Sequence, residues 1–336
     1  MNNKEKFLLA FALLASISAG FLLGRLTMAE PVAVSTPSIT DCQNNLEERR
    51  VGGGYKFINP LLECDNYQPS QLNSVVDMER SVQEFIRKSQ DEKKANFVSV
   101  YFRDLNFGPW MGINEKESFS PASLLKVPIM IAALKKAETD PTFLHKKILY
   151  TEHLDKAVVP NITDPNLVKI GHTYTIEDLM ERMIRFSDNE AKEMILRNLD
   201  QDFIIKVMSD IGINTQVDMS SDFVSVKDYS GFFRLLYNAT YLNRNLSEKA
   251  LDILSRTSFD KGIMAGLPKG VTVSHKFGER AFSDNNIKQL HECGIVYVSG
   301  QPYLLCVMTR GNDFNEQASV IAGISSIVYK NIQDKK

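Results

Sequence analysis

Hydrophobic residues recur at helical spacing in two segments of this chain, at residues 72–90 and 315–332. The first segment, LNSVVDMERSVQEFIRKSQ, places apolar side chains at Val75, Val76 and Val82. The second, NEQASVIAGISSIVYKNI, has the same character. Both patterns predict amphipathic helices.

Short apolar segments between these helices predict five strands. Two follow the first helix closely, at residues 96–105 and 108–115, and three precede the last helix, at 271–279, 289–298 and 302–311. Each combines β-branched or aromatic residues with turn-forming neighbours.

From Ser123 to about Thr257 the spacing is helical again. The order is therefore helix, two strands, a long helical block, three strands and a helix. We expect an α+β fold (an α/β sandwich): one five-stranded antiparallel sheet, the terminal helices on one face, and an inserted all-helical subdomain.

The N-terminus carries a separate signal. Phe7–Gly24 is uncharged, with Lys4 and Lys6 before it and Arg25 after it. Residues 1–29 are predicted to be a membrane anchor or a cleaved signal peptide, and the length of the run favours the anchor. We therefore expect an extracytoplasmic protein, held in the membrane through this helix or secreted if the segment is cleaved.

Residues 30–71 are predicted to be a linker and a cysteine-containing arm, and residues 72–336 the main domain. Cys42 and Cys64 of the arm could close a disulfide in an exported protein. The arm suggests no function.

Cys293 and Cys306 fall in two neighbouring apolar strands. There, buried thiols are expected in preference to a bridge.

The composition narrows the possible functions. The chain has 336 residues, 43% of them apolar and 24% charged, with a net charge of −2. Basic residues are spread along the chain, so nucleic-acid binding is not expected. The five histidines form no metal-ligand spacing, and no cofactor motif occurs, so we expect neither a metal nor a cofactor.

Three short motifs carry candidate chemistry. Ser123 and Lys126 are three residues apart at a helix start, so that the lysine could act as base for the serine hydroxyl. Ser187 and Asn189, in FSDN, follow an amphipathic helix, and Lys276 and Gly278, in SHKFGER, lie on a predicted strand. Alone, each motif is weak: the first equally suits a helix cap, and the second a turn.

Together, the order S-x-x-K, S-D-N, K-x-G resembles that of the serine β-lactamase and penicillin-binding protein superfamily, most closely the class A β-lactamases. The flanking segments SFSPASLLKVPI and YTIEDLMERMIRFSDNEA are similar to the family's. The resemblance covers about Leu72 to Ile332, and it implies the family's β-lactamase/transpeptidase-like fold.

The resemblance also implies roles. Ser123 would become acylated, Lys126 would be the general base, and Ser187 would pass a proton to the leaving nitrogen with help from Lys276. Asn189 and Gly278 would help to bind substrate. The backbone N–H groups of Ser123 and Glu279 would form the oxyanion hole.

Each motif has a second copy. These lie at Ser258–Lys261, at Ser283–Asn285 and at Lys169–Gly171. All three fall outside the family's order, and we expect them to be structural. Ser283–Asn285 would form a turn between two strands.

The chain departs from the family pattern at three points. Phe277 replaces Thr or Ser in K-T-G. Glu279 stands where Ser or Thr often helps to hold a carboxylate, and strand alternation points Arg280 away from it. The segment expected to be the Ω loop has no glutamate, although Asp218 or Asp222 could substitute for it.

The sequence thus predicts an exported serine hydrolase that forms an acyl-enzyme at Ser123 and opens β-lactam amides. A slow D-Ala-D-Ala peptidase or penicillin-binding protein is the alternative, as is a non-catalytic peptidoglycan-binding relative. The expected partners are a small-molecule β-lactam or a peptidoglycan stem peptide, and we expect a monomer.

Overall fold

The computed structural model describes residues 55–60, 72–106, 108–154, 166–213, 221–282 and 286–333. The chain divides into two units, Met1–Glu47 and Glu48–Lys336, and all the described residues belong to the second. The predicted anchor at Phe7–Gly24, and Cys42 and Cys64, lie outside them. Within the described ranges, no helix combines the length and the apolar character needed to cross a membrane.

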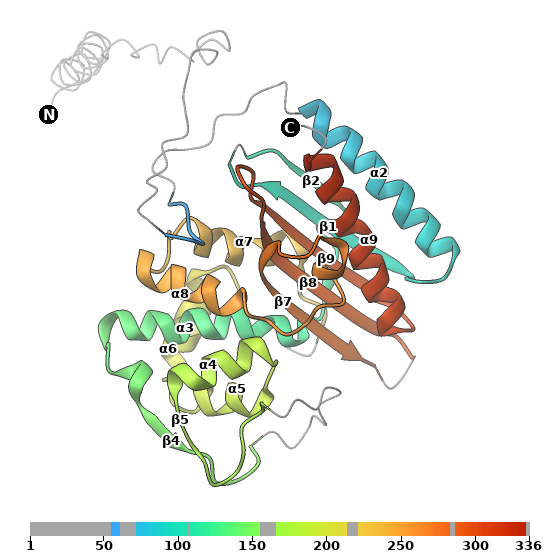
Figure 1. The fold of residues 1–336 in the computed structure, drawn as a ribbon. Helices are drawn as coiled ribbons and strands as arrows, with labels where there is room; N and C mark the ends of the chain where they lie inside the picture. The colour runs from blue at the N-terminus through green and yellow to red at the C-terminus, as the bar shows by residue number, and fades with distance from the viewer. Residues whose placement is uncertain are drawn as a thin grey trace, which may run out of the picture. The chain divides into compact units, whose positions relative to one another are not determined.

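Five antiparallel strands form the central sheet, in the order β2-β1-β9-β8-β7 (Figure 1). They are β1 (Phe97–Asp104), β2 (Trp110–Ile113), β7 (Thr272–Ala281), β8 (Lys288–Tyr297) and β9 (Tyr303–Gly311). The early and late strands meet where β1 pairs with β9. This confirms the sheet expected from the sequence.

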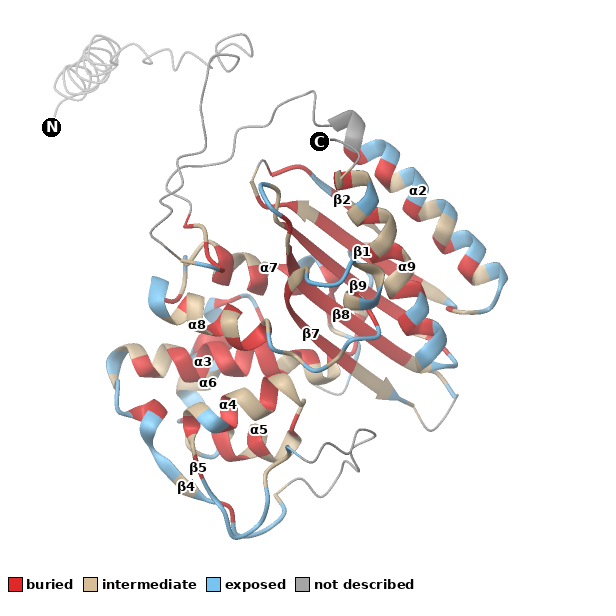
Figure 2. Cartoon of the chain, in the orientation of Figure 1, coloured by how far each residue is buried: buried red, intermediate tan, exposed pale blue. Residues whose placement is uncertain are grey.

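The terminal helices α2 (Leu72–Asp91) and α9 (Phe314–Gln333) lie together on one face of this sheet (Figure 1). Val98, Val100 and Phe102 of β1 pack in the core beneath them. Tyr101, between them in sequence, belongs to the core of the other face, as strand alternation requires. Figure 2 shows the strands almost entirely buried and the outer side of α2 exposed.

The inserted block covers the other face. Its helices are α3 (Lys126–Thr139), α4 (Ile176–Arg185), α5 (Asn189–Leu196), α6 (Gln201–Asp210), α7 (Val226–Tyr237) and α8 (Arg244–Leu254). Two short 3-10 turns accompany them, η3 (Ala122–Leu125) and η4 (Phe143–His145), whereas η5 (Met264–Gly266) lies against α9 on the opposite face of the sheet.

The sequence had suggested an all-helical block, but the block also contains short strands. β4 (Lys147–Leu149) pairs with β5 (Thr173–Thr175), and β6 (Val224–Ser225) pairs with β3 (Ser118–Phe119), which precedes the block. These strands are two or three residues long, too short for an alternating pattern to be recognised.

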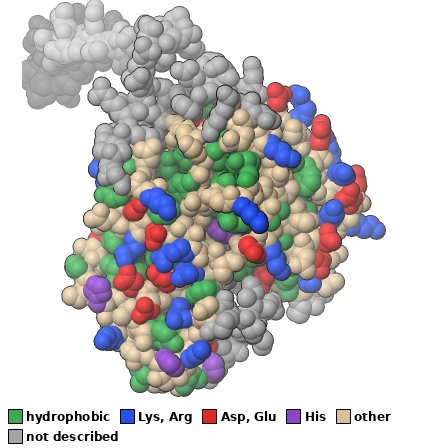
Figure 3. Space-filling model, in the orientation of Figure 1, with side chains coloured by type: hydrophobic (Ala, Val, Ile, Leu, Met, Phe, Trp, Pro, Cys, Tyr) green, Lys and Arg blue, Asp and Glu red, His purple; other side chains and the backbone are tan. Residues whose placement is uncertain are grey.

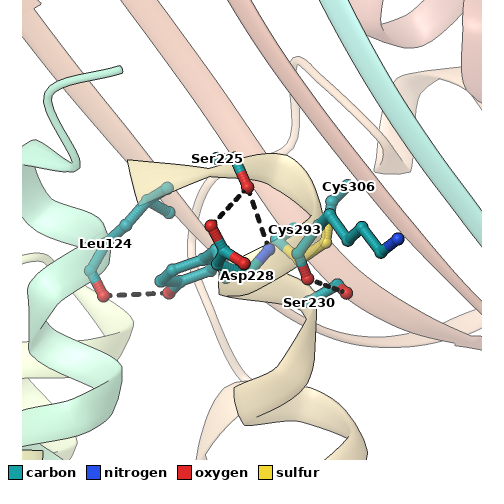
Figure 4. The surroundings of a disulfide bond; sticks show 8 residues. Leu124, Ser225, Asp228, Ser230, Cys293 and Cys306 are labelled. Atoms are coloured by element: carbon teal, nitrogen blue, oxygen red, sulfur yellow. Dashed lines mark hydrogen bonds between the residues drawn. A yellow bond between two sulfur atoms is a disulfide. The ribbon is translucent and has the colours of Figure 1, made fainter. Parts of the chain in front are cut away.

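Cys293 and Cys306 form a disulfide in this structure, so the expectation of two buried thiols is wrong. The antiparallel register of β8 and β9 puts the two residues directly opposite each other, with Cα atoms 4.0 Å apart. Figure 4 shows the bond beside Ser225, Asp228 and Ser230. The sequence predicts neighbouring strands but not their register, and it is the register that brings the sulfurs together.

Part of the arm packs on the main body. Phe57 and Ile58 are 3% and 5% exposed and belong to the core between the sheet and the inserted block. The predicted boundary at residue 72 stays a prediction, but residues 55–60 contact the body directly.

On the face seen in Figure 3, basic and acidic side chains are interspersed.

Candidate active site

The turn that carries Ser123 lies between β3 and α3. Ser123 is in η3 and is partly exposed, and α3 begins at Lys126. Ala122, just before the serine, has a φ of 48°, a left-handed conformation that is strained for a residue with a Cβ. Such strain persists only where surrounding contacts hold it, and it is common at active sites.

Lys126 reaches back to the serine. Its side chain is buried, and Nζ donates to Ser123 Oγ at 3.1 Å. The same nitrogen lies 2.5 Å from the Ser187 carbonyl oxygen, 3.0 Å from Ser187 Oγ and 2.7 Å from Asn189 Oδ1, so that its three N–H groups are shared among four acceptors. The structure thus brings together the S-x-x-K and S-D-N motifs, which are far apart in sequence.

The first FSDN connects α4 to α5. Ser187 has a φ of 55°, which turns the chain sharply and presents its hydroxyl to both motif lysines. Asp188 caps α5: its Oδ1 accepts from Ala191 N at 3.1 Å, and its Oδ2 accepts from Val168 N at 2.8 Å. The aspartate therefore braces the turn, while its two neighbours face Lys126.

Lys276 approaches Ser187 from the sheet. It lies on β7, the edge strand, and Nζ donates to Ser187 Oγ at 3.0 Å and to the Phe277 carbonyl at 2.9 Å. Complete burial lowers the pKa of Lys276 to about 7, against the opposing influence of the Glu279 and Glu292 carboxylates. Ser123, Lys126, Ser187 and Lys276 therefore form one continuous hydrogen-bonded chain.

Gly278 allows β7 to approach the turn that carries Ser123. A Cβ at this position would lie 2.8 Å from the Pro121 carbonyl oxygen and 3.0 Å from Leu124 N. The resemblance implied that Gly278 helps to bind substrate. In the structure, the turn carrying Ser123 occupies the space where a Cβ would lie, so the glycine sets the distance between the turn and the strand. Glu279, the next residue, is thereby placed beside the same turn.

Burial accommodates the first of the departures, at Phe277. Phe277 is buried and stacks on Phe259, with ring centroids 4.3 Å apart. Arg280 donates to Ser120 Oγ at 2.8 Å, on the same side of β7 as Lys276 and opposite to Phe277 and Glu279.

Asp222, one of the two proposed substitutes for the Ω-loop glutamate, is engaged elsewhere. Its carboxylate pairs with Arg310 at 2.9 Å and accepts from Gln289 Nε2 at 3.2 and 3.3 Å. Asp218 lies outside the described residues.

Two of the second copies of the motifs, at Ser258 and at Lys169, lie apart from the hydrogen-bonded chain. Ser258 Oγ donates to the Arg185 carbonyl at 2.8 Å, and the backbone N–H of the exposed Lys169 donates to Tyr174 Oη at 2.9 Å. The copy at Ser283–Asn285 falls outside the described residues, although the strands on either side of it pair through Ala281 and Lys288.

The sequence did not reveal the buried residues that hold the turn carrying Ser123 in place. Tyr229 of α7 is one: its hydroxyl donates to the Leu124 carbonyl at 2.9 Å (Figure 4 shows the acceptor). It lies in the helical block, and no local motif marks it. A buried tyrosine on an amphipathic helix is the only signal that the sequence offers.

Known structures share this fold. A mutant of PBP-A, in an acyl-enzyme complex with penicillin G, superposes with a TM-score of 0.63 at 21% identity, covering 77% of this chain and 97% of that one. A class A β-lactamase from Bacteroides cellulosilyticus DSM 14838 gives 0.65 at 20% identity, covering 76% and 99%. The TLA-3 extended-spectrum β-lactamase gives 0.65 at 19% identity, covering 75% and 98%.

The sequence comparisons give two results. No curated protein matches the chain. Residues 77–332, more than half of the 336 residues, match the pattern of the beta-lactamase enzyme family. The fold, the order of the motifs and this match agree, and the chain belongs to the beta-lactamase enzyme family.

Proposed function

We propose that this protein is an exported serine hydrolase of the class A β-lactamase type, which opens β-lactam amides through an acyl-enzyme at Ser123. The observation that carries the proposal is the contact of 3.1 Å between Lys126 Nζ and Ser123 Oγ, at a buried lysine. A neutral lysine at that distance can take the hydroxyl proton as the oxygen attacks the carbonyl carbon.

The other motif residues have matching roles. The negative charge that develops on the carbonyl oxygen would be received by the backbone N–H groups of Ser123 and Glu279, each worth about 3–4 kcal/mol in comparable enzymes. The Ser187 hydroxyl would give its proton to the leaving nitrogen and regain one from Lys126 or Lys276, both 3.0 Å away. Asn189 Oδ1 accepts from Lys126, so the NH₂ group of the Asn189 amide would donate to a substrate carbonyl.

A second candidate is a slow D-Ala-D-Ala peptidase, a penicillin-binding protein whose acyl-enzyme persists. The engagement of Asp222 by Arg310 and Gln289 favours it, because an ion-paired carboxylate that already accepts hydrogen bonds is a poor base for water. The PBP-A structure, an acyl-enzyme with penicillin G, is a precedent in the same fold.

Intact mass spectrometry tests both candidates. Residues 41–336 are incubated with penicillin G, and the adduct is followed over time in parallel with the turnover of a chromogenic cephalosporin. Fast turnover supports the β-lactamase. A lasting adduct supports the peptidase. Absence of both at high β-lactam concentration would contradict both and favour a non-catalytic peptidoglycan-binding relative.

Ser123→Ala should abolish the adduct. Ser258→Ala is the matched control, because Ser258 heads the second S-x-x-K sequence but its hydroxyl donates to the backbone. It should leave acylation unchanged.

We also propose that residues 1–29 direct export and hold the protein at the membrane, on the strength of the uncharged run Phe7–Gly24. The full chain should sediment with membranes and be accessible to protease from the extracytoplasmic side. Recovery of the full-length chain in the soluble cytoplasmic fraction would contradict this.

A further inference from the structure

Ser120, three residues before Ser123, is held by side chains from the central sheet. Its backbone N–H donates to Gln289 Oε1 at 3.1 Å, its carbonyl lies 3.1 Å from His291 Nε2, and its hydroxyl accepts from Arg280 Nη1 at 2.8 Å. All three polar atoms of Ser120 are thus bound by β7 and β8. Ser120 is fully buried, and Gln289 and His291 are 2% and 0% exposed.

The contacts fix the protonation of this cluster. His291 Nε2 faces two acceptors, the Ser120 carbonyl and Gln289 Oε1 at 3.2 Å, so Nε2 carries the proton. Burial lowers the pKa of His291 to about 4, and the ring is neutral at neutral pH. The Gln289 amide is fixed as well, since its oxygen accepts from two donors and its NH₂ group faces the Asp222 carboxylate.

The cluster continues to the segment ahead of Ser120. Asp222 pairs with Arg310, which donates to the Ser118 carbonyl at 2.5 Å and lies over the Phe119 ring at 4.3 Å. Phe119 in turn packs edge-on against His291, with ring centroids 5.2 Å apart. Residues 118–120 are therefore bound on several sides.

We propose that Gln289 and His291 are positioning residues for Ser123. By fixing Ser120 on one side of the turn, while Tyr229 and the close approach of Gly278 fix Leu124 on the other, they hold Ala122 in its left-handed conformation. Release of Ser120 would let the turn relax and move the Ser123 hydroxyl away from Lys126. This inference rests on the proposed function, in which Ser123 is the nucleophile.

The test compares Gln289→Leu with a matched control, Thr309→Val. Thr309 is equally buried in the adjacent strand, but its hydroxyl bonds to the Leu290 carbonyl and to Gln317 of α9, on the opposite face of the sheet. His291→Phe is the second variant; it keeps a ring against Phe119 but removes the donor to Ser120. The stability of each variant is measured first, by urea unfolding.

The readout is the acylation of Ser123 by penicillin G, resolved into the saturation constant and the limiting rate. We expect Gln289→Leu and His291→Phe to lower the limiting rate by about 10- to 100-fold with little change in the saturation constant, because misplacement by about 1 Å can cost that much. Thr309→Val should stay within about 3-fold of the wild type, even if it loses as much stability, because its hydroxyl does not touch the turn. Limiting rates in the first two variants equal to that of Thr309→Val would overturn the proposal.

Hydrogen exchange of the peptide covering residues 118–126 separates this inference from the proposed function. If the wild type is not acylated at all, the proposed function fails, but the positioning role still predicts faster exchange in Gln289→Leu than in Thr309→Val. Equal exchange in the two variants would overturn it independently of any β-lactam.

Discussion

Ser187 is the residue on which the two lysines of the site converge. Its hydroxyl accepts from Lys126 and from Lys276, each at 3.0 Å, and its backbone is left-handed, with a φ of 55°. The sequence identified this serine by its place in the order of the motifs. The backbone conformation that aims it at both lysines became visible only in the structure.

Ser187→Gly should therefore fold but acylate slowly. Glycine adopts a positive φ without a steric cost, which should partly offset the hydrogen bonds that Lys126 and Lys276 lose, so stability to urea should fall only modestly. If the hydroxyl transfers a proton as proposed, its loss should lower the acylation rate about 10²- to 10⁴-fold. Ala239→Gly is the control, since Ala239 has a similar φ of 50° and no motif role. Wild-type acylation by Ser187→Gly would refute the relay.

The pH dependence of the acylation rate should show an alkaline limb near pH 7, caused by the deprotonation of Lys276. Its pKa is lowered to about 7, so that the folded protein loses this positive charge just above neutrality. Acylation by anionic penicillin G should then fall as the pH rises from 7 to 9, whereas an uncharged penicillin ester should be less affected. Lys276→Arg keeps its charge and should lack this limb. A limb that persists in Lys276→Arg would assign it to another group.

The lowered pKa of Lys276 also makes the free energy of unfolding depend on pH. The pKa of Lys276 is lower in the folded state than its ordinary value of 10.5. Between about pH 7 and 10.5 the unfolded chain therefore binds more protons at this site than the folded chain does. The contribution of Lys276 to the free energy of unfolding accordingly increases with pH across that range.

At the scale of elements, the start of α5 fixes the geometry of S-D-N. Asp188 both caps this helix and accepts from Val168 N, and it is only 3% exposed. Asp200 caps α6 in the same way, through Phe203 N, but is exposed. The two aspartates are thus a matched pair that differs in burial and in the second contact.

Asp188→Ala should lower the free energy of unfolding by about 2–4 kcal/mol, because it removes a cap and leaves a second N–H without its acceptor. Asp200→Ala should cost only about 1 kcal/mol. Urea unfolding of the two variants checks the difference. Equal losses would show that the contact with Val168 contributes little.

Elements with a long repeating pattern were predictable, and short ones were not. The predicted helix at 72–90 is α2, and the three late strands correspond to β7, β8 and β9. β4, β5 and β6 were missed, because strands of two or three residues have no periodicity to detect. Their formation depends on partners that are distant in sequence, as in the pairing of Phe119 with Val224.

At the scale of the whole molecule, residues 55–60 fasten the arm to the body. The Glu248 carboxylate on α8 accepts from the backbone N–H groups of Lys56 at 2.7 Å, and of Phe57 and Ile58 at 2.9 Å. The Phe57 ring packs against Tyr297 of β8, with centroids 5.4 Å apart. Residues 55–60 lie outside residues 77–332, which match the family, but Glu248 and Tyr297, which they contact, lie within them.

Phe57→Ala should therefore lower the free energy of unfolding of the main body by about 3 kcal/mol, the usual cost of truncating a buried aromatic ring. Glu248→Gln should cost about 1–3 kcal/mol, because three N–H groups lose a charged acceptor. Val76→Ala is the control, since Val76 is 49% exposed and should change stability little. Thermal unfolding of residues 41–336 measures all three. An unchanged transition in Phe57→Ala would mean that the arm does not contribute to the folded body.

The sequence by itself determined the class of fold, the family and the identity of the motif residues, because periodicity and motif order are properties of the chain alone. Only the tertiary structure decided how the motifs meet: Lys126 lies next to Asn189, and Ser187 lies between two lysines. It also decided the pairing of Cys293 with Cys306 and the capture of Ser120 by Gln289 and His291. These contacts depend on strand register and on packing between distant segments, which local patterns do not encode.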